Sequence, residues 1–155
     1  MELADILTEG SVLVCAGVRN KTELLNQIAT RAAEITGQDR GEIESALLGR
    51  EALGSTGLGN GIAVPHGKIA GLQKVAAIFA RCIEPVDFDA VDDQPVDLAI
   101  ALLAPMGSGA DHLKALARVA RLLRTEWIVE RLRATDNPGE LYSLLTGGAK
   151  NHAAA

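Results

Sequence analysis

The chain has few aromatic residues and few cysteines. Of its 155 residues only four are aromatic, so a buried core must be built from Leu, Ile, Val and Ala (Phe79, Phe88, Trp127 and Tyr142 are the exceptions). The two cysteines, Cys15 and Cys82, are far apart in the sequence and lie in apolar runs. This placement favours buried thiols in a reducing cytoplasm, and a disulfide between them is the less favoured alternative.

Several kinds of segment are missing altogether. No apolar run approaches the roughly 20 residues of a membrane span, and the N-terminus lacks the basic start and long apolar segment of a signal peptide. The net charge is −5 and no basic run is present, which argues against nucleic acid or an anionic membrane as a partner. The three histidines and two dispersed cysteines lack ligand spacing, which disfavours a metal hydrolase. We therefore expect a cytoplasmic protein.

Helical patterns are clear in the first third of the chain. Asn20 and Glu23 have the spacing of a capping box, and apolar residues then recur at helical spacing until Gly37. A second helix is expected from Asp39 to about Arg50, immediately before a glycine-rich segment.

Three helices are expected in the last third. A long one begins near Ala110, and shorter ones begin at Thr125 or Glu126 and at Asn137, where Pro138 occupies the first helical position. The long helix is predicted to pack through one apolar stripe: Leu113, Leu116, Ala117, Ala120 and Leu123.

Strands are expected between these helices, at residues 12–14, 74–83 and 97–104. The last is an apolar run ended by Pro105, which is typical of a strand covered on both faces. Strands that alternate with helices predict a single-domain α/β/α sandwich, a mixed β-sheet with helices on both faces. We expect this domain to span residues 1–146, with a flexible C-terminal tail at 147–155.

The segment from Gly54 to Lys68 is the most unusual stretch of the chain. Its four leading glycines allow positive φ, so the segment can curl its amide groups around an anion. Pro65 restricts the backbone before His66, which is therefore expected on a stiff, strand-like arm, with Lys68 supplying positive charge nearby. A histidine held in this way could carry a phosphoryl group. The alternative is a glycine-rich turn before a strand, with His66 an ordinary surface residue.

Known glycine motifs do not fit this segment. The dinucleotide fingerprint fails because Ile62 stands where the third glycine belongs, and the P-loop pattern fails because Ile69 replaces the hydroxyl residue. Ser55 lies in Gly-Ser-Thr-Gly, which is not the surrounding of a nucleophilic serine in G-x-S-x-G.

Two further residues are expected near His66. Arg50 ends the second helix just before the glycine segment, although a cation that stabilises the helix C-terminus is a sufficient alternative explanation. His112 lies in the first turn of the long helix, where the helix dipole favours a neutral imidazole. The alternative for His112 is a surface polar residue.

Taken together, these motifs resemble one known family. Gly49-Arg50-Glu51, the run from Ser55 to Lys68 containing Gly-Asn-Gly-Ile-Ala-Val-Pro-His, the stretch from Phe88 to Leu98, and His112-Leu113 closely resemble enzyme IIA domains of the mannitol/fructose class. These are phosphocarriers of the bacterial phosphoenolpyruvate-dependent phosphotransferase system. The resemblance covers residues 1–146 and is strongest to the stand-alone nitrogen-regulatory type.

The resemblance implies a function for the three candidate residues. His66 is expected to accept a phosphoryl group on Nε2 from the phosphocarrier HPr or its nitrogen-system counterpart, with Arg50 and His112 assisting. The protein would then be a histidine phosphotransfer enzyme without metal or organic cofactor, regulating nitrogen-linked, potassium-linked or metabolic processes through protein contacts. Two alternatives are a sugar-specific enzyme IIA that passes phosphate to an enzyme IIB and a non-catalytic binding module of the same fold. The resemblance names no partner that fixes the His66 tautomer, and it leaves the oligomeric state open.

Overall fold

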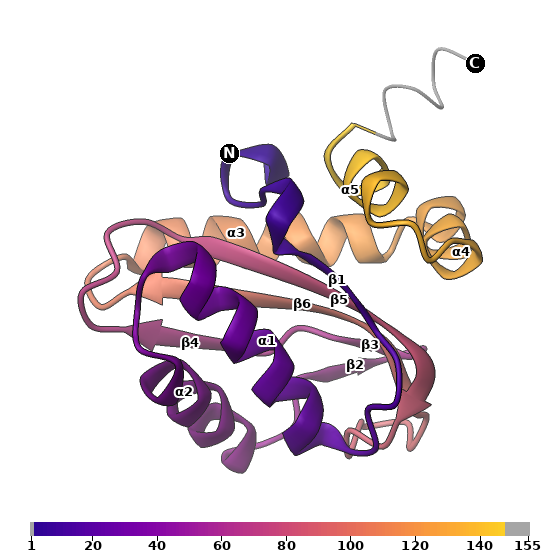
Figure 1. Ribbon diagram of the computed structural model, residues 1–155, viewed down its shortest axis with the longest axis horizontal. Helices are drawn as coiled ribbons and strands as arrows, with labels where there is room; N and C mark the ends of the chain where they lie inside the picture. The colour runs from indigo at the N-terminus through magenta and orange to yellow at the C-terminus, as the bar shows by residue number, and fades with distance from the viewer. Residues whose placement is uncertain (1, 148–155) are drawn as a thin grey trace.

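A mixed six-stranded sheet forms the centre of the fold, and helices cover both of its faces (Figure 1). The computed structural model describes residues 2–147. The strands are β1 (Val12–Cys15), β2 (Gly57–Gly59), β3 (Ile62–Ala63), β4 (His66–Ile69), β5 (Ala76–Val86) and β6 (Val96–Pro105). The helices are α1 (Lys21–Thr36), α2 (Arg40–Ala52), α3 (Gly109–Leu123), α4 (Glu126–Ala134) and α5 (Pro138–Thr146), with two 3-10 turns, η1 (Leu3–Asp5) and η2 (Glu9–Ser11). The predicted fold class is confirmed.

The sheet order is β1-β5-β6-β3-β2, and β4 also pairs with β6. The β5–β6 and β2–β3 pairs are antiparallel, whereas β1 runs parallel to β5, and both β3 and β4 run parallel to β6. Successive residues of β6 point to opposite faces of the sheet. Leu98, Ile100 and Leu102 belong to the core under α3, α4 and α5, and Ala99, Ala101 and Leu103 belong to the core under α1 and α2.

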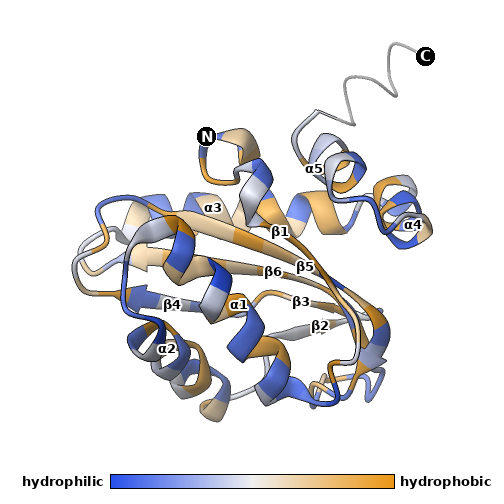
Figure 2. Ribbon diagram, in the orientation of Figure 1, coloured by the Kyte–Doolittle hydropathy of each residue, from blue (hydrophilic) through white to orange (hydrophobic). Residues whose placement is uncertain are grey.

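Both faces of the central strands are therefore buried. Figure 2 shows the apolar β5 and β6 lying between the two helical layers. The prediction that residues 97–104 form a strand covered on both faces is confirmed, because a strand needs apolar residues at every position only when each face carries a core.

The predicted helix starts are confirmed by their caps. The side chain of Asn20 accepts a hydrogen bond from the Glu23 amide at 2.9 Å, and that of Asp39 accepts one from the Glu42 amide at 3.0 Å. Gly37 adopts φ +75° at the end of α1, a left-handed conformation that stops the helix.

The predicted apolar stripe of α3 is right only in part: Leu123 is buried and Leu116 packs against the core, but other predicted positions face solvent. Leu113 has 67% of its surface exposed and Ala117 is also exposed, whereas Ala115, Val119 and His112 are buried together with Leu123. Helix α3 packs on β6, and small side chains such as Ala115 allow a close approach to the sheet. The sequence offers apolar residues on two overlapping stripes, and contact with the sheet selects the one that includes His112.

Cys15 and Cys82 are both free and buried, as expected from the sequence. The structure adds that they are paired positions on the neighbouring strands β1 and β5. A hydrogen bond between the thiols lowers the pKa of Cys15 and, together with burial, raises the pKa of Cys82.

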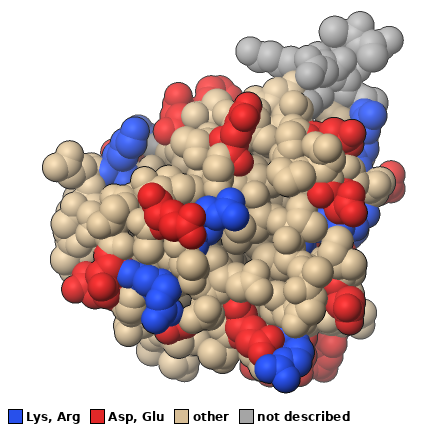
Figure 3. Space-filling model, in the orientation of Figure 1, with Lys and Arg blue, Asp and Glu red and all other residues tan. Residues whose placement is uncertain are grey.

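The described surface carries mixed charge. On the face shown in Figure 3, acidic and basic side chains are interspersed among uncharged ones rather than gathered in a basic patch. Within residues 2–147 no helix combines the length and apolar character needed to cross a membrane. The expected tail falls mostly at 148–155, outside the described residues.

Candidate functional site

The glycine-rich segment folds into a small hairpin. Strands β2 and β3 are joined at Asn60 and Gly61, whose φ angles are +57° and +79°. This turn favours Asn-Gly because both of its central residues have positive φ. The Gly57 amide donates to Ser55 Oγ at 3.0 Å and the Asn60 amide donates to Asp92 Oδ2 at 2.9 Å. These amides are used within the chain, so the interpretation of an anion cradle is wrong for them.

The hairpin leads directly to His66. After β3 the chain passes through Val64 and Pro65, and His66 is the first residue of β4. The Leu102 amide of β6 donates to the Pro65 carbonyl at 2.9 Å, which ties this break to the centre of the sheet. His66 is thus a half-buried residue at the start of β4, just after the break that separates β4 from β3, and both short strands pair with β6. The expected rigid arm is confirmed, with the difference that His66 begins a strand.

Two hydrogen bonds define the state of the His66 ring. Nδ1 lies 2.8 Å from the Val64 carbonyl oxygen, and Nε2 lies 3.2 Å from Nε of Arg50. A carbonyl can only accept a hydrogen bond and a guanidinium can only donate one. Nδ1 must therefore carry the proton, and Nε2 must present its lone pair. The partner that fixes the tautomer is the carbonyl of Val64, two residues before His66.

Arg50 reaches His66 from the last turn of α2. Its Nη1 donates to the Gly54 carbonyl at 2.8 Å, just beyond the end of the helix, while its Nε faces His66. The two interpretations made from the sequence are thus compatible, because one guanidinium with five donors can serve the chain after the helix and the histidine together.

His112 lies beside His66. The two ring centroids are 5.6 Å apart with an interplanar angle of 69°, an edge-to-face arrangement. His112 is only 9% exposed, so the alternative of a surface residue is wrong. Burial is the main cause that lowers the pKa of His112, and the electrostatic influence of the neighbouring His66 ring and of the Lys68 ammonium adds to it. The predicted neutral imidazole is supported, with burial as the main cause in place of the helix dipole.

One ring nitrogen of His112 is left without a partner. Its Nδ1 is buried and makes no hydrogen bond with the residues described. A buried polar atom of this kind costs free energy unless a further group satisfies it. The site thus combines a nucleophilic nitrogen, a cation and an unused hydrogen-bonding group, which together suit an anionic group at Nε2 of His66.

Sequence reasoning missed a buried carboxylate behind the site. Glu51, next to Arg50, is 8% exposed and accepts hydrogen bonds from both the amide and the hydroxyl of Thr56. Nζ of Lys21 lies 2.8 Å from the same carboxylate. A signal was present in the sequence, because a glutamate in the last turn of a helix opposes the helix dipole and calls for another explanation.

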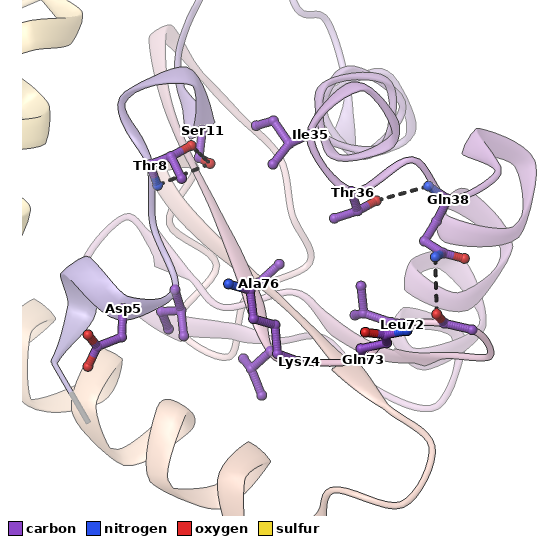
Figure 4. Close-up of a pocket in the computed structure, with 13 residues that line it drawn as sticks. Asp5, Thr8, Ser11, Ile35, Thr36, Gln38, Leu72, Gln73, Lys74 and Ala76 are labelled. Carbon is purple, nitrogen blue, oxygen red and sulfur yellow. Dashed lines mark hydrogen bonds between the residues drawn. The ribbon is translucent and has the colours of Figure 1, made fainter.

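A groove of about 730 Å³ lies between the N-terminal segment, the end of α1 and the loop before β5 (Figure 4). Thr8, Ser11, Gln38 and Lys74 supply polar groups to its wall, and Gln38 bonds across to the Gly71 carbonyl at 3.2 Å. Neither Arg50 nor either histidine of the site lines this groove. The candidate site is therefore separate from it.

Comparison with known proteins finds matches over nearly the whole chain. The family model described as "Phosphoenolpyruvate-dependent sugar phosphotransferase system, EIIA 2" matches residues 5–147. The nitrogen regulatory protein of Bradyrhizobium diazoefficiens is 47% identical over 145 residues, which cover 94% of this chain and 95% of that protein.

Two solved structures share the fold. The nitrogen regulatory protein IIA-Ntr from Neisseria meningitidis has a TM-score of 0.86 and 32% identity, covering 93% of this chain and 99% of that one. The mannitol IIA of Escherichia coli has a TM-score of 0.75 at 24% identity, covering 90% of this chain and 98% of that one. The second likeness concerns the fold alone.

Proposed function

This chain belongs to the EIIA type-2 family of the phosphoenolpyruvate-dependent phosphotransferase system, and we propose that it is a phosphocarrier that accepts a phosphoryl group on Nε2 of His66. The observation that carries the proposal is the pair of hydrogen bonds on the imidazole, from Nδ1 to Val64 and from Arg50 to Nε2. They leave the lone pair at the half-buried Nε2, beside a cation.

The reaction follows from that tautomer. The lone pair of Nε2 attacks the phosphorus of a phosphohistidine on an HPr-type phosphocarrier. A P–N bond forms at His66 while the donor's P–N bond breaks, and its electron pair leaves with the donor's imidazole. The Nδ1 proton stays bonded to the Val64 carbonyl, which stabilises the positive charge that develops on the ring.

Arg50 and His112 supply the electrostatic stabilisation. The guanidinium must release Nε2 as the P–N bond forms, and its N–H groups can then donate to the phosphoryl oxygens. The His112 ring, whose Nδ1 has no partner among residues 2–147, lies against His66 and offers a further hydrogen bond. Phosphoryl transfer depends mostly on positioning and charge stabilisation, so no metal is required in this scheme.

The biological role follows from the relatives. We place the chain with the nitrogen-regulatory type, because near-complete coverage at 47% identity ties it to a protein of that name. Its phosphorylation state would then control nitrogen-linked, potassium-linked or metabolic processes through contacts with target proteins. Transfer from the phosphorylated chain to a fructose- or mannitol-type enzyme IIB would instead support a sugar-specific role.

The direct test is phosphorylation of the purified protein. Incubation with phosphoenolpyruvate, enzyme I and an HPr-type phosphocarrier should add the mass of one acid-labile phosphoryl group. His66→Ala should abolish the increase, whereas the matched control His152→Ala, which removes the third histidine of the chain, should keep it. Equal labelling of His66→Ala would overturn the proposal.

A further inference from the structure

The buried carboxylate of Glu51 connects to both partners of the His66 ring. We infer that Glu51 is a positioning residue, which acts through Thr56 to hold His66 in its reactive tautomer and Arg50 at its side. This inference rests on the proposed function, because it assigns a role in the same transfer. Glu51 touches neither the ring nor the guanidinium in the hydrogen bonds described.

Helix stability does not explain Glu51. It lies in the last turn of α2, where the exposed carbonyl groups disfavour negative charge, and it is 8% exposed. Burying a carboxylate costs free energy unless it is paired and hydrogen-bonded. Here Thr56 donates through both its amide and its hydroxyl, and Lys21 supplies the opposite charge. The Glu51 carboxylate thus has hydrogen-bond donors and an opposite charge at a position that is unfavourable for the stability of α2. This arrangement indicates that Glu51 has a function other than stabilising the helix.

The first connection runs from Thr56 to His66. The Thr56 carbonyl accepts the Val64 amide at 3.0 Å, and the Val64 carbonyl accepts Nδ1–H of His66 at 2.8 Å. Glu51 therefore fixes the position of Thr56, Thr56 fixes Val64 through their main-chain hydrogen bond, and Val64 fixes the His66 ring. Glu51 acts on the ring through geometry. The Val64 carbonyl belongs to the peptide bond with Pro65, and because proline has no amide hydrogen, no further hydrogen bond through that peptide group can polarise the carbonyl.

The second connection runs to Arg50. The carboxylate of Glu51 closes the short loop between the end of α2 and Thr56, and this loop contains Gly54. The Gly54 amide donates to the Glu51 carbonyl at 3.1 Å, and the Gly54 carbonyl accepts from Nη1 of Arg50 at 2.8 Å. The main-chain carbonyl of Glu51 thus holds Gly54 directly, and its carboxylate holds the other end of the same loop through Thr56.

Lys21 anchors this arrangement to the start of α1. Its side chain is 17% exposed, and its Nζ lies 3.9 Å from Asp89 and 4.6 Å from the centroid of the Phe88 ring. The hydroxyl of Ser55 donates to the Phe88 carbonyl at 2.8 Å, so the loop after β5 is also tied to the glycine segment. Three segments far apart in the sequence meet around one carboxylate.

Two measurements separate positioning from stability. Glu51→Gln should lower the transfer rate at saturating donor on the order of 10- to 100-fold, because small misplacements of reacting groups have effects of that size. The KM for the phosphocarrier should stay near the wild-type value, because Glu51 is buried behind the site. Nitrogen-15 NMR of the His66 ring, which needs no phosphoryl transfer, should show one tautomer in the wild type and a mixture in Glu51→Gln.

A pair of Thr56 variants covers the case in which Glu51→Gln fails to fold. Thr56→Val keeps the shape of the side chain but loses the hydroxyl, and should mix the tautomers of His66. Thr56→Ser keeps the hydroxyl, and should restore the wild-type spectrum. Glu23→Gln is the matched control, since it breaks an ion pair of 2.7 Å with Arg19 that lies outside the Glu51–Thr56–Val64 connection.

The outcomes distinguish this inference from the proposed function. Wild-type tautomer and wild-type transfer in folded Glu51→Gln and Thr56→Val would overturn the positioning role. The same result in Thr56→Val alone would overturn it if Glu51→Gln does not fold. A third outcome combines two results: the variants show mixed tautomers of His66, and the wild-type protein takes up no phosphoryl group. This outcome would support the positioning role of Glu51 and reject the phosphocarrier function.

Discussion

Nε of Arg50 lies 3.2 Å from Nε2 of His66, so the nitrogen that would attack phosphorus is hydrogen-bonded to a cation in the resting site. This contact holds the ring in one tautomer and at the same time occupies its lone pair. In the proposed transfer, the guanidinium would therefore have to exchange His66 for the oxygens of the incoming phosphoryl group. Arg50 can make this exchange with little movement, because its Nη1 stays anchored to Gly54.

Replacing Arg50 by lysine tests this exchange. Lysine keeps the charge at the end of α2 but loses the planar fork that can contact Gly54, His66 and phosphate together. Arg50→Lys should fold normally and should transfer phosphate about 10- to 100-fold more slowly, as measured by rapid-quench labelling from a phosphorylated HPr-type protein. If the variant keeps the wild-type rate, Arg50 serves only the helix end.

Removing the His112 ring tests its supporting role. His112→Ala should still be phosphorylated on His66, but more slowly, because loss of one positioned hydrogen-bonding group typically costs on the order of 10²-fold in rate. Circular dichroism and the melting temperature report whether the fold is intact. An unchanged rate in both directions of transfer would remove His112 from the mechanism, and an unfolded variant would make its role structural.

The lowered pKa of His112 predicts a pH dependence of stability. In the unfolded chain this histidine titrates near its usual value of about 6.5, whereas burial and the neighbouring His66 and Lys68 keep it neutral to lower pH in the folded protein. Below about pH 6.5 the unfolded state therefore binds more protons, and the free energy of unfolding should fall as the pH decreases. Above that pH this contribution is fully present.

Denaturant unfolding followed by the fluorescence of Trp127, the single tryptophan, measures this effect. His112→Asn should show a weaker loss of stability between about pH 7.5 and pH 5.5 than the wild type. His152→Asn, which removes a histidine outside the described residues, should follow the wild type. The same slope in all three proteins would contradict the assignment to His112.

Local patterns were sufficient for most of the fold. Asn20 and Asp39 cap their helices as the sequence indicates, since a cap depends on residues three positions apart. The apolar run of β6 indicated a sheet with helices on both faces for a similar reason, because burial on two sides requires apolar residues at successive positions. The motif around His66 indicates the family without any knowledge of tertiary contacts, because its residues are adjacent in the sequence.

The sequence by itself determined the five helices, the strands β1, β5 and β6, the fold class and the identity of His66, Arg50 and His112 as candidates. Only the tertiary structure decided which face of α3 is buried, that Cys15 and Cys82 are neighbours, and that Glu51 and Thr56 lie behind the site. The physical reason is the distance along the sequence over which each kind of interaction acts. Caps, periodicity and turn chemistry act within a few residues, whereas the state of the His66 ring depends on donors and acceptors that α2, the glycine segment and α3 bring together only when the sheet has formed.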